Sequence, residues 1–159
     1  MACGSIGGGG VMTMRIYKKL GPEDLQILVN TSDYADALEL WQIDEESAQE
    51  FLSNPVNCFF ACIEDSKIIG YVCGYELSRL DDAGNMLYIH GVGVHRDYRR
   101  QGIAKQMIAA VKEFCKVGGI KKMFLYTHKI NVAACALYES SEGVQHRDDN
   151  VSYFFSKFE

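Results

Sequence analysis

The sequence predicts a mixed α/β (α+β) domain with a central, mostly antiparallel sheet, flanking helices and one β-α-β crossover. Apolar and aromatic runs at 57–63, 68–77 and 86–94, separated by turn residues, have the pattern of antiparallel strands. A helical periodicity over 102–117 then separates the third run from a fourth at 123–127. With 159 residues, 48% of them hydrophobic and 23% charged, the chain has the size and composition of one globular domain.

The first residues differ in composition from the rest. Residues 1–11 are uncharged and include four consecutive glycines, Gly7 to Gly10, without the basic region or apolar core of a signal peptide. We expect 1–11 to be an appended linker without regular structure. Native sequence should begin near Met12 or Met14, and residues 12–159 should form a single domain.

Two helices are expected after a first short strand at 15–18. The first should open at Pro22, because proline is tolerated in the first helical turn. Its apolar stripe consists of Leu25, Leu28 and Val29. The second is expected over 44–52 and should end before Pro55. The stretch 31–43 has no clear pattern, and its acids either bind a cationic substrate or face solvent.

Three strands follow in the middle of the chain. The runs at 57–63 and 68–77 are separated by a short turn, which predicts a hairpin. A loop at 81–85 then leads to the strand at 86–94.

The helix expected over 102–117 has its apolar residues at helical spacing. These residues are Ile103, Met107, Ile108, Val111, Phe114 and Cys115. The Gly-Gly pair at 118–119 should end the helix. A strand over 123–127, a short helix over 132–140 and a final strand over 151–158 complete the expected order.

Charge and cysteine content exclude several classes. A formal net charge of −5 argues against nucleic acid as a partner, because phosphate backbones need a basic face. No apolar run approaches the roughly 18 residues that predict a membrane span. The six cysteines lack Cys-x-x-Cys or zinc-type spacing, so we expect reduced thiols, a cytoplasmic protein and no metal site.

The crossover between the strand at 86–94 and the helix starting near Gly102 is a candidate anion site. Free amides at a helix start and the positive end of the helix dipole attract phosphate groups. Gly102 and Ala104 permit close backbone approach, and Arg99 and Arg100 add positive charge. The segment is neither a Walker loop nor a Gly-x-Gly-x-x-Gly dinucleotide motif.

A second motif, Asn131-x-x-Ala134-x-x-Leu137-Tyr138, follows the next expected strand. Preceded by Val92-Gly93-Val94 and Arg99-x-x-Gly102-x-Ala104, it completes a pattern that resembles the GNAT superfamily of acetyl-coenzyme A-dependent N-acetyltransferases over residues 59–158. Residues 88–104 are similar to the aminoglycoside 3-N-acetyltransferase-like branch. His90 and Gly91 stand where that branch usually carries an acid.

The resemblance implies a GNAT fold with acetyl-CoA as cosubstrate at the crossover. It implies that loop and helix amides hold the pyrophosphate, that the strand edge pairs with the pantetheine arm, and that the short helix lies beside the thiol. The residues so implied are Arg99, Arg100, Gln101, Gly102, Ile103 and Ala104 for the first role, Val92, Gly93 and Val94 for the second, and Asn131, Ala134 and Tyr138 for the third.

The reaction needs an acid for the leaving thiolate and a base for the attacking amine. The Tyr138 phenol is the candidate acid, although it could also be an aromatic residue that packs its helix onto the sheet. Three candidates remain for the base. His90 should share strand parity with Val92 and Val94, Glu76 lies on the preceding strand, and a water relay is the third.

The expected acceptor is a small cationic amine, such as an aminoglycoside or a polyamine-like molecule, attacked directly in a ternary complex. A protein or peptide amine is the alternative enzyme substrate. A coenzyme A-binding module with little turnover is the alternative of another class. GNAT proteins often pair, so a homodimer is possible.

Overall fold

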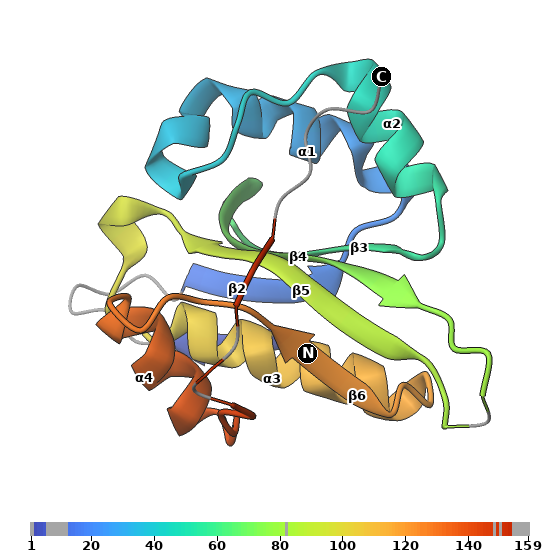
Figure 1. Cartoon of the computed structure of the whole chain (residues 1–159). Coiled ribbons are helices and arrows are strands. Elements are labelled where there is room, and N and C mark those ends of the chain that lie inside the picture. The colour runs from blue at the N-terminus through green and yellow to red at the C-terminus, as the bar shows by residue number, and fades with distance from the viewer. Residues whose placement is uncertain (1, 6–12, 82, 148, 150, 154–159) are drawn as a thin grey trace.

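The computed structural model describes residues 2–5, 13–81, 83–147, 149 and 151–153 (Figure 1). The strands are β1 (Ala2–Ser5), β2 (Thr13–Lys19), β3 (Asn57–Glu64), β4 (Lys67–Leu77), β5 (Met86–Val94) and β6 (Lys122–Leu125). The α-helices are α1 (Leu25–Asn30), α2 (Glu45–Ser53), α3 (Ile103–Val117) and α4 (Val132–Ser140). Short 3-10 helices are η1 (Pro22–Asp24), η2 (Thr31–Leu38) and η3 (Arg96–Tyr98).

The strands form one sheet in sequence order, β1-β2-β3-β4-β5-β6. Every neighbouring pair is antiparallel except β5 and β6, which are parallel and are connected through α3. A parallel pair requires such a crossover, because a tight turn cannot bring the chain back to the same end of the sheet. The predicted fold class, a mostly antiparallel sheet with one β-α-β unit, is confirmed.

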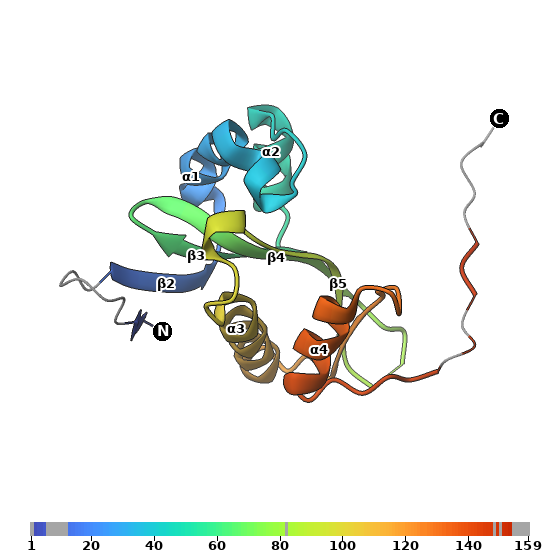
Figure 2. The same ribbon diagram turned by 90° about the vertical axis from the view of Figure 1, so that its left-hand side faces the viewer.

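Helices cover both faces of the sheet (Figure 2). The segments α1, η2 and α2 lie over one face, and α3 and α4 lie over the other. We call these the α2 face and the α3 face. Side chains alternate along β4, so Val72 belongs to the core under α3 and Tyr71 to the core under α1 and α2.

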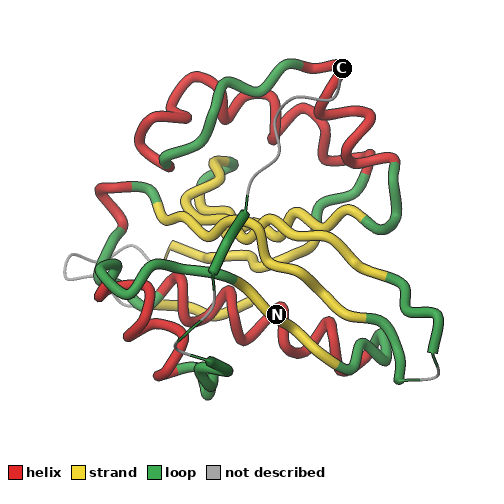
Figure 3. The backbone as a smooth tube through the Cα atoms, in the orientation of Figure 1, coloured by secondary structure: helices red, strands yellow, loops and turns green. Residues whose placement is uncertain are grey.

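The helical pattern predicted for α3 is confirmed by its burial. Ile103, Met107, Ile108, Val111 and Cys115 are all buried in the core on the α3 face. After the helix, Gly119 has a φ of 69°, a left-handed conformation that glycine adopts at little cost. Within the stretch 31–43 that had no clear pattern, Thr31–Leu38 form the 3-10 helix η2 (Figure 3).

Two expectations for the ends of the chain fail where the structure describes them. Ala2–Ser5, expected to lack regular structure, is a strand that pairs antiparallel with β2. The expected final strand is absent at residues 151–153, which lie in a segment extending away from the sheet (Figure 2), with no strand beside them in the described part. Residues 154–158 of that expected strand lie outside the described residues.

The helices of the described part of the chain include none with the length and apolar character needed to span a bilayer.

Candidate active site

Strand β5 contains a β-bulge at His90. Cys73 of β4 pairs with Gly91, whereas the next residue, Gly74, pairs with Ile89, so His90 is an extra residue without a partner on β4. On its other side, β5 pairs with β6 only from Met86 to Ile89. Within the described residues, the edge from His90 onward has no neighbouring strand. It can therefore receive an extended substrate arm.

The bulge reverses the expected orientation of His90. Val92 and Val94 pack against the core on the α3 face. The His90 ring lies 6.0 Å from the Tyr88 ring, and Tyr88 alternates with the buried Ile89, which also belongs to that α3-face core. His90 therefore lies on the α2 face. The prediction that it shares parity with the two valines is wrong, because the bulge adds one residue between them.

Glu76 lies on the opposite face from His90. It is two residue pairs along β4 from Val72, which faces α3. Its carboxylate accepts a hydrogen bond of 2.7 Å from the Asn85 amide nitrogen. The sheet thus separates the two sequence-predicted base candidates.

The loop before α3 has an unusual backbone. Arg100 has a φ of 63° and Gly102 a φ of 76°. Successive turns of this kind can aim backbone amides at an anion. The first intrahelical donor is the Gln106 amide, which bonds the Gly102 carbonyl at 3.1 Å. The amides of Ile103, Ala104 and Lys105 therefore have no partner within the helix.

Space is available at this helix start. A Cβ added to Gly102 would meet no atom within 4 Å. The missing side chain leaves the backbone accessible, and Arg100 beside it is exposed. An open, amide-rich and positively charged helix start fits the pyrophosphate of acetyl-CoA.

A buried ion pair supports the same loop from below. Arg15 of β2 donates from Nε to the Glu64 carboxylate at 2.6 Å and from Nη2 to the Gln101 side-chain oxygen at 2.5 Å. Arg15 and Glu64 are each only 7% exposed. Arg15 could not be predicted from the sequence, because nothing local relates it to a loop 86 residues away.

Arg99 connects the loop to the helices of the α2 face. Its Nε donates to the Val94 carbonyl at 3.1 Å, and its Nη2 donates to the Glu39 carboxylate at 2.6 Å. The Arg99 guanidinium is thus paired with a carboxylate of the protein itself. Arg100 is also exposed.

Helix α4 carries the second motif. Asn131 caps its start by accepting a hydrogen bond of 3.1 Å from the Ala134 amide. Tyr138, on the last turns of the helix, packs against the core on the α3 face. Burial, with a smaller contribution from Cys135, raises the pKa of Tyr138 above its ordinary value. The phenol therefore keeps its proton at neutral pH.

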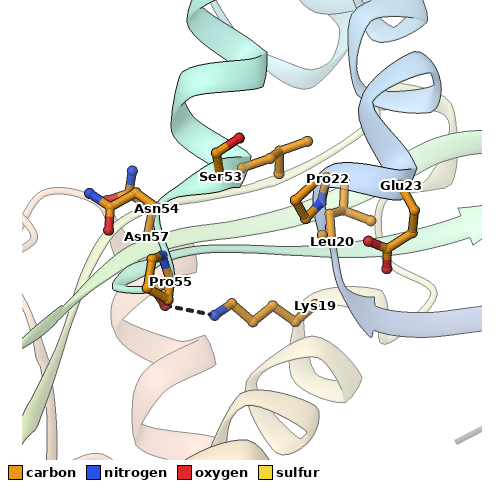
Figure 4. Close-up of a pocket in the computed structure, with 10 residues that line it drawn as sticks. Lys19, Leu20, Pro22, Glu23, Ser53, Asn54, Pro55 and Asn57 are labelled. Atoms are coloured by element: carbon orange, nitrogen blue, oxygen red, sulfur yellow. Dashed lines mark hydrogen bonds between the residues drawn. The ribbon is translucent and has the colours of Figure 1, made fainter.

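A cavity of about 340 Å³ lies elsewhere in the molecule, between the end of β2 and the turn that follows α2 (Figure 4). Lys19 closes one side by donating to the Pro55 carbonyl at 3.2 Å. Lys19 is the last residue of β2, whereas Arg15, which contacts the loop before α3, lies earlier on that strand. In the described residues, no three His, Cys, Asp or Glu side chains converge to hold a metal ion.

Residues 24–143 match the model of the acetyltransferase (GNAT) family. The chain belongs to this family. This family uses acetyl-CoA, and the sequence resemblance predicts the cosubstrate at the open helix start at Gly102.

Relatives of known sequence include other acetyltransferases. An acetyltransferase of Pectobacterium atrosepticum is 26% identical over 132 residues, which cover 82% of this chain and 86% of that protein. N-acetylaspartate synthetase of Xenopus tropicalis and human N-acetyltransferase 8 are each 29% identical over 92 residues, 58% of this chain. The matches span only 32% and 40% of those two proteins.

Solved structures share the GNAT fold. An aminoglycoside acetyltransferase from an uncultured soil metagenomic sample, in complex with sisomicin, has a TM-score of 0.73 at 21% identity, covering 91% of this chain and 97% of that one. The aminoglycoside N-acetyltransferase AAC(6')-Iy, in complex with CoA, has a TM-score of 0.72 at 15% identity, covering 94% and 99%. The latter is a 6' enzyme, so the resemblance to the 3-N branch gains no specific support.

Proposed function

We propose that this GNAT protein transfers the acetyl group of acetyl-CoA directly to the primary amine of a small molecule in a ternary complex. The observation that carries the proposal is the unpaired edge of β5. It begins at the His90 bulge and ends at Val94, shortly before the open helix start at Gly102. One extended substrate can therefore run from the loop to the bulge.

Each part of this path has a role in cosubstrate binding. The backbone from Arg99 through Gln101 and Gly102 to Ala104 binds the pyrophosphate, aided by the helix dipole. The edge at Val92, Gly93 and Val94 pairs with the pantetheine arm. Asn131, Ala134 and Tyr138 of α4 lie beside the thiol. Isothermal titration with CoA tests these assignments.

The chemical step is acyl transfer. The amine nitrogen attacks the thioester carbonyl carbon, giving a tetrahedral oxyanion, and loses its proton to a base. The C–S bond then breaks, and the departing sulfur takes the Tyr138 proton. Because burial raises the Tyr138 pKa, the proton donor is present across the neutral range. Solvent later returns a proton to the phenolate.

The Tyr138→Phe variant tests the acid. It removes only the hydroxyl, so the ring keeps its packing against the α3-face core. We expect kcat to fall about tenfold or more, while the Kd for CoA stays nearly constant. An unchanged kcat would show that Tyr138 serves only to pack α4.

His90 is the proposed base, acting directly or through a water molecule. It lies at the bulge and on the α2 face, whereas Glu76 lies on the α3 face with Asn85 as its partner. The His90→Ala variant should lose the acidic limb of the pH–rate profile. Glu76→Gln is the matched control. Loss of the limb in Glu76→Gln alone would transfer the role to Glu76.

An amine panel separates the acceptor classes. Exposed acids such as Asp33, Asp36 and Glu46 on η2 and α2 keep an aminoglycoside or a polyamine as candidates, and a structural neighbour binds sisomicin. Peptides represent the protein-acetylating alternative. CoA release is measured for each amine. If CoA binds and no amine stimulates its release, the chain is a CoA-binding module instead.

A further inference from the structure

Five aromatic rings form a continuous surface on the α2 face, which we call the aromatic cluster. Its members are Tyr75, Tyr88, His90, Phe124 and Tyr126. Tyr88 is central, with ring centroids 6.5 Å from Tyr75, 6.0 Å from His90, 5.4 Å from Phe124 and 6.3 Å from Tyr126. These separations are within the range in which aromatic rings attract one another.

The aromatic cluster lies where β5 and β6 separate. Tyr88 pairs with Phe124, and the last pair of the two strands is Ile89 with Leu125. His90 is the next residue on β5 and Tyr126 is the first residue after β6, so their rings flank the point at which pairing stops. Tyr126 is 73% exposed, and the His90 side chain is also exposed. The rings are therefore accessible beside the proposed position of the thioester.

The aromatic cluster is in contact with a cation. The Lys122 ammonium lies 5.8 Å from the Phe124 ring centroid and already uses one ring of the cluster as a cation site. Glu76, the carboxylate nearest along β4, is on the other face. An ammonium group placed at the Phe124 ring would meet the positive charge of Lys122. The aromatic ring of an acceptor would instead pack against the edges and faces of the rings in the aromatic cluster.

We propose that the acceptor is an arylalkylamine, a primary amine joined by a short chain to an aromatic ring, and that this ring packs against Tyr88 and Tyr126. The inference rests on the proposed acetyl transfer at the same site. The amine then extends from the aromatic cluster toward His90 and the end of the β5 edge. Recognition is by stacking and apolar burial rather than by ion pairs.

The test compares 2-phenylethylamine with butylamine and spermidine, measuring CoA release with saturating acetyl-CoA. We expect kcat/KM for 2-phenylethylamine to exceed the other two by about tenfold or more, since a tenfold ratio needs only about 1.4 kcal/mol of extra binding. A kcat/KM for spermidine or butylamine as high as that for 2-phenylethylamine would overturn the inference and leave acetyl transfer intact. If no amine is acetylated while CoA binds, both proposals fail.

Two variants at Tyr88 test whether its ring causes the preference for 2-phenylethylamine. Tyr88→Leu removes the central ring and should lower the preference for 2-phenylethylamine over butylamine about tenfold. Tyr88→Phe keeps the ring and should keep the preference. Titration with CoA shows whether each variant is folded. If Tyr88→Leu binds CoA and lowers kcat/KM equally for both amines, the aromatic cluster has only a structural role. If Tyr88→Leu does not fold, Tyr126→Leu, at the exposed side of the cluster, replaces it. CoA binding and the preference for 2-phenylethylamine over butylamine are then measured for that variant.

Discussion

The ion pair beneath the cosubstrate loop gives the sharpest test of the structure, through the variant Arg15→Met. Arg15 Nε and the Glu64 carboxylate are 2.6 Å apart, and the two side chains are only 8% and 7% exposed. Methionine roughly preserves the volume but leaves the Glu64 charge buried without its partner. Breaking a buried pair in this way costs about 3–5 kcal/mol of stability. For a domain of this size, that loss lowers Tm by roughly 6–20 °C.

The same substitution should weaken cosubstrate binding. Gln101 loses the 2.5 Å hydrogen bond from Arg15 Nη2 that fixes the loop between Arg99 and Gly102. A hydrogen bond to a charged group contributes about 1.5–3 kcal/mol. A loss at the lower end of that range raises the Kd for CoA about tenfold. Thermal unfolding and isothermal titration measure the two effects separately.

A double variant distinguishes stability from loop support. In Arg15→Met/Glu64→Gln the uncompensated carboxylate is gone, so much of the lost Tm should return. Gln101 still lacks its donor, so the Kd for CoA should stay raised. A less buried pair provides the control: Lys18 of β2 with Asp24 of η1 at 2.9 Å, with side chains 38% and 16% exposed. Lys18→Met should cost less stability than Arg15→Met, because the Lys18 side chain is more exposed than that of Arg15. An Arg15→Met protein with wild-type Tm and Kd would refute the reasoning.

Three further outcomes follow from the packing and the titrating groups. Gly93→Ala should lower the Tm measured by thermal unfolding markedly. The added Cβ would overlap the Tyr71 ring and come 2.8 Å from the Leu38 carbonyl oxygen. An unchanged Tm would contradict this packing. Gly102→Ala should cost about 1 kcal/mol of stability, because an alanine at a φ of 76° is strained. It should also raise the Kd for CoA, because the new Cβ occupies the open space at the helix start. Burial raises the pKa of Tyr71 from 10.0 to about 12 and that of Cys115 from 9.0 to about 11. The protonated forms therefore contribute stability below pH 9 that is lost as pH rises through 11 and 12, and denaturant unfolding at pH 8, 10 and 11 should show the decline.

Local patterns in the sequence were enough to predict most of the helices and strands. The helical spacing of α3 and the apolar runs of β3, β4 and β5 are properties of consecutive residues, so they could be predicted without knowledge of their neighbours. The expected strand at residues 151–153 failed for the complementary reason. Its composition suits a strand, but a strand also needs a neighbour, and in the described chain these residues lie away from the sheet.

The candidate site also contains features that adjacent residues specify and features that only tertiary contacts specify. The sequence by itself determined the crossover, the glycine at position 102 and the motif that ends at Tyr138, because an open helix start is specified by a few adjacent residues. Only the tertiary structure decided which face His90 occupies, since a bulge is defined by the register of two strands. It also decided that Arg15 supports Gln101 across 86 residues of chain, a contact that arises when β2 packs beneath the loop and that no local pattern encodes.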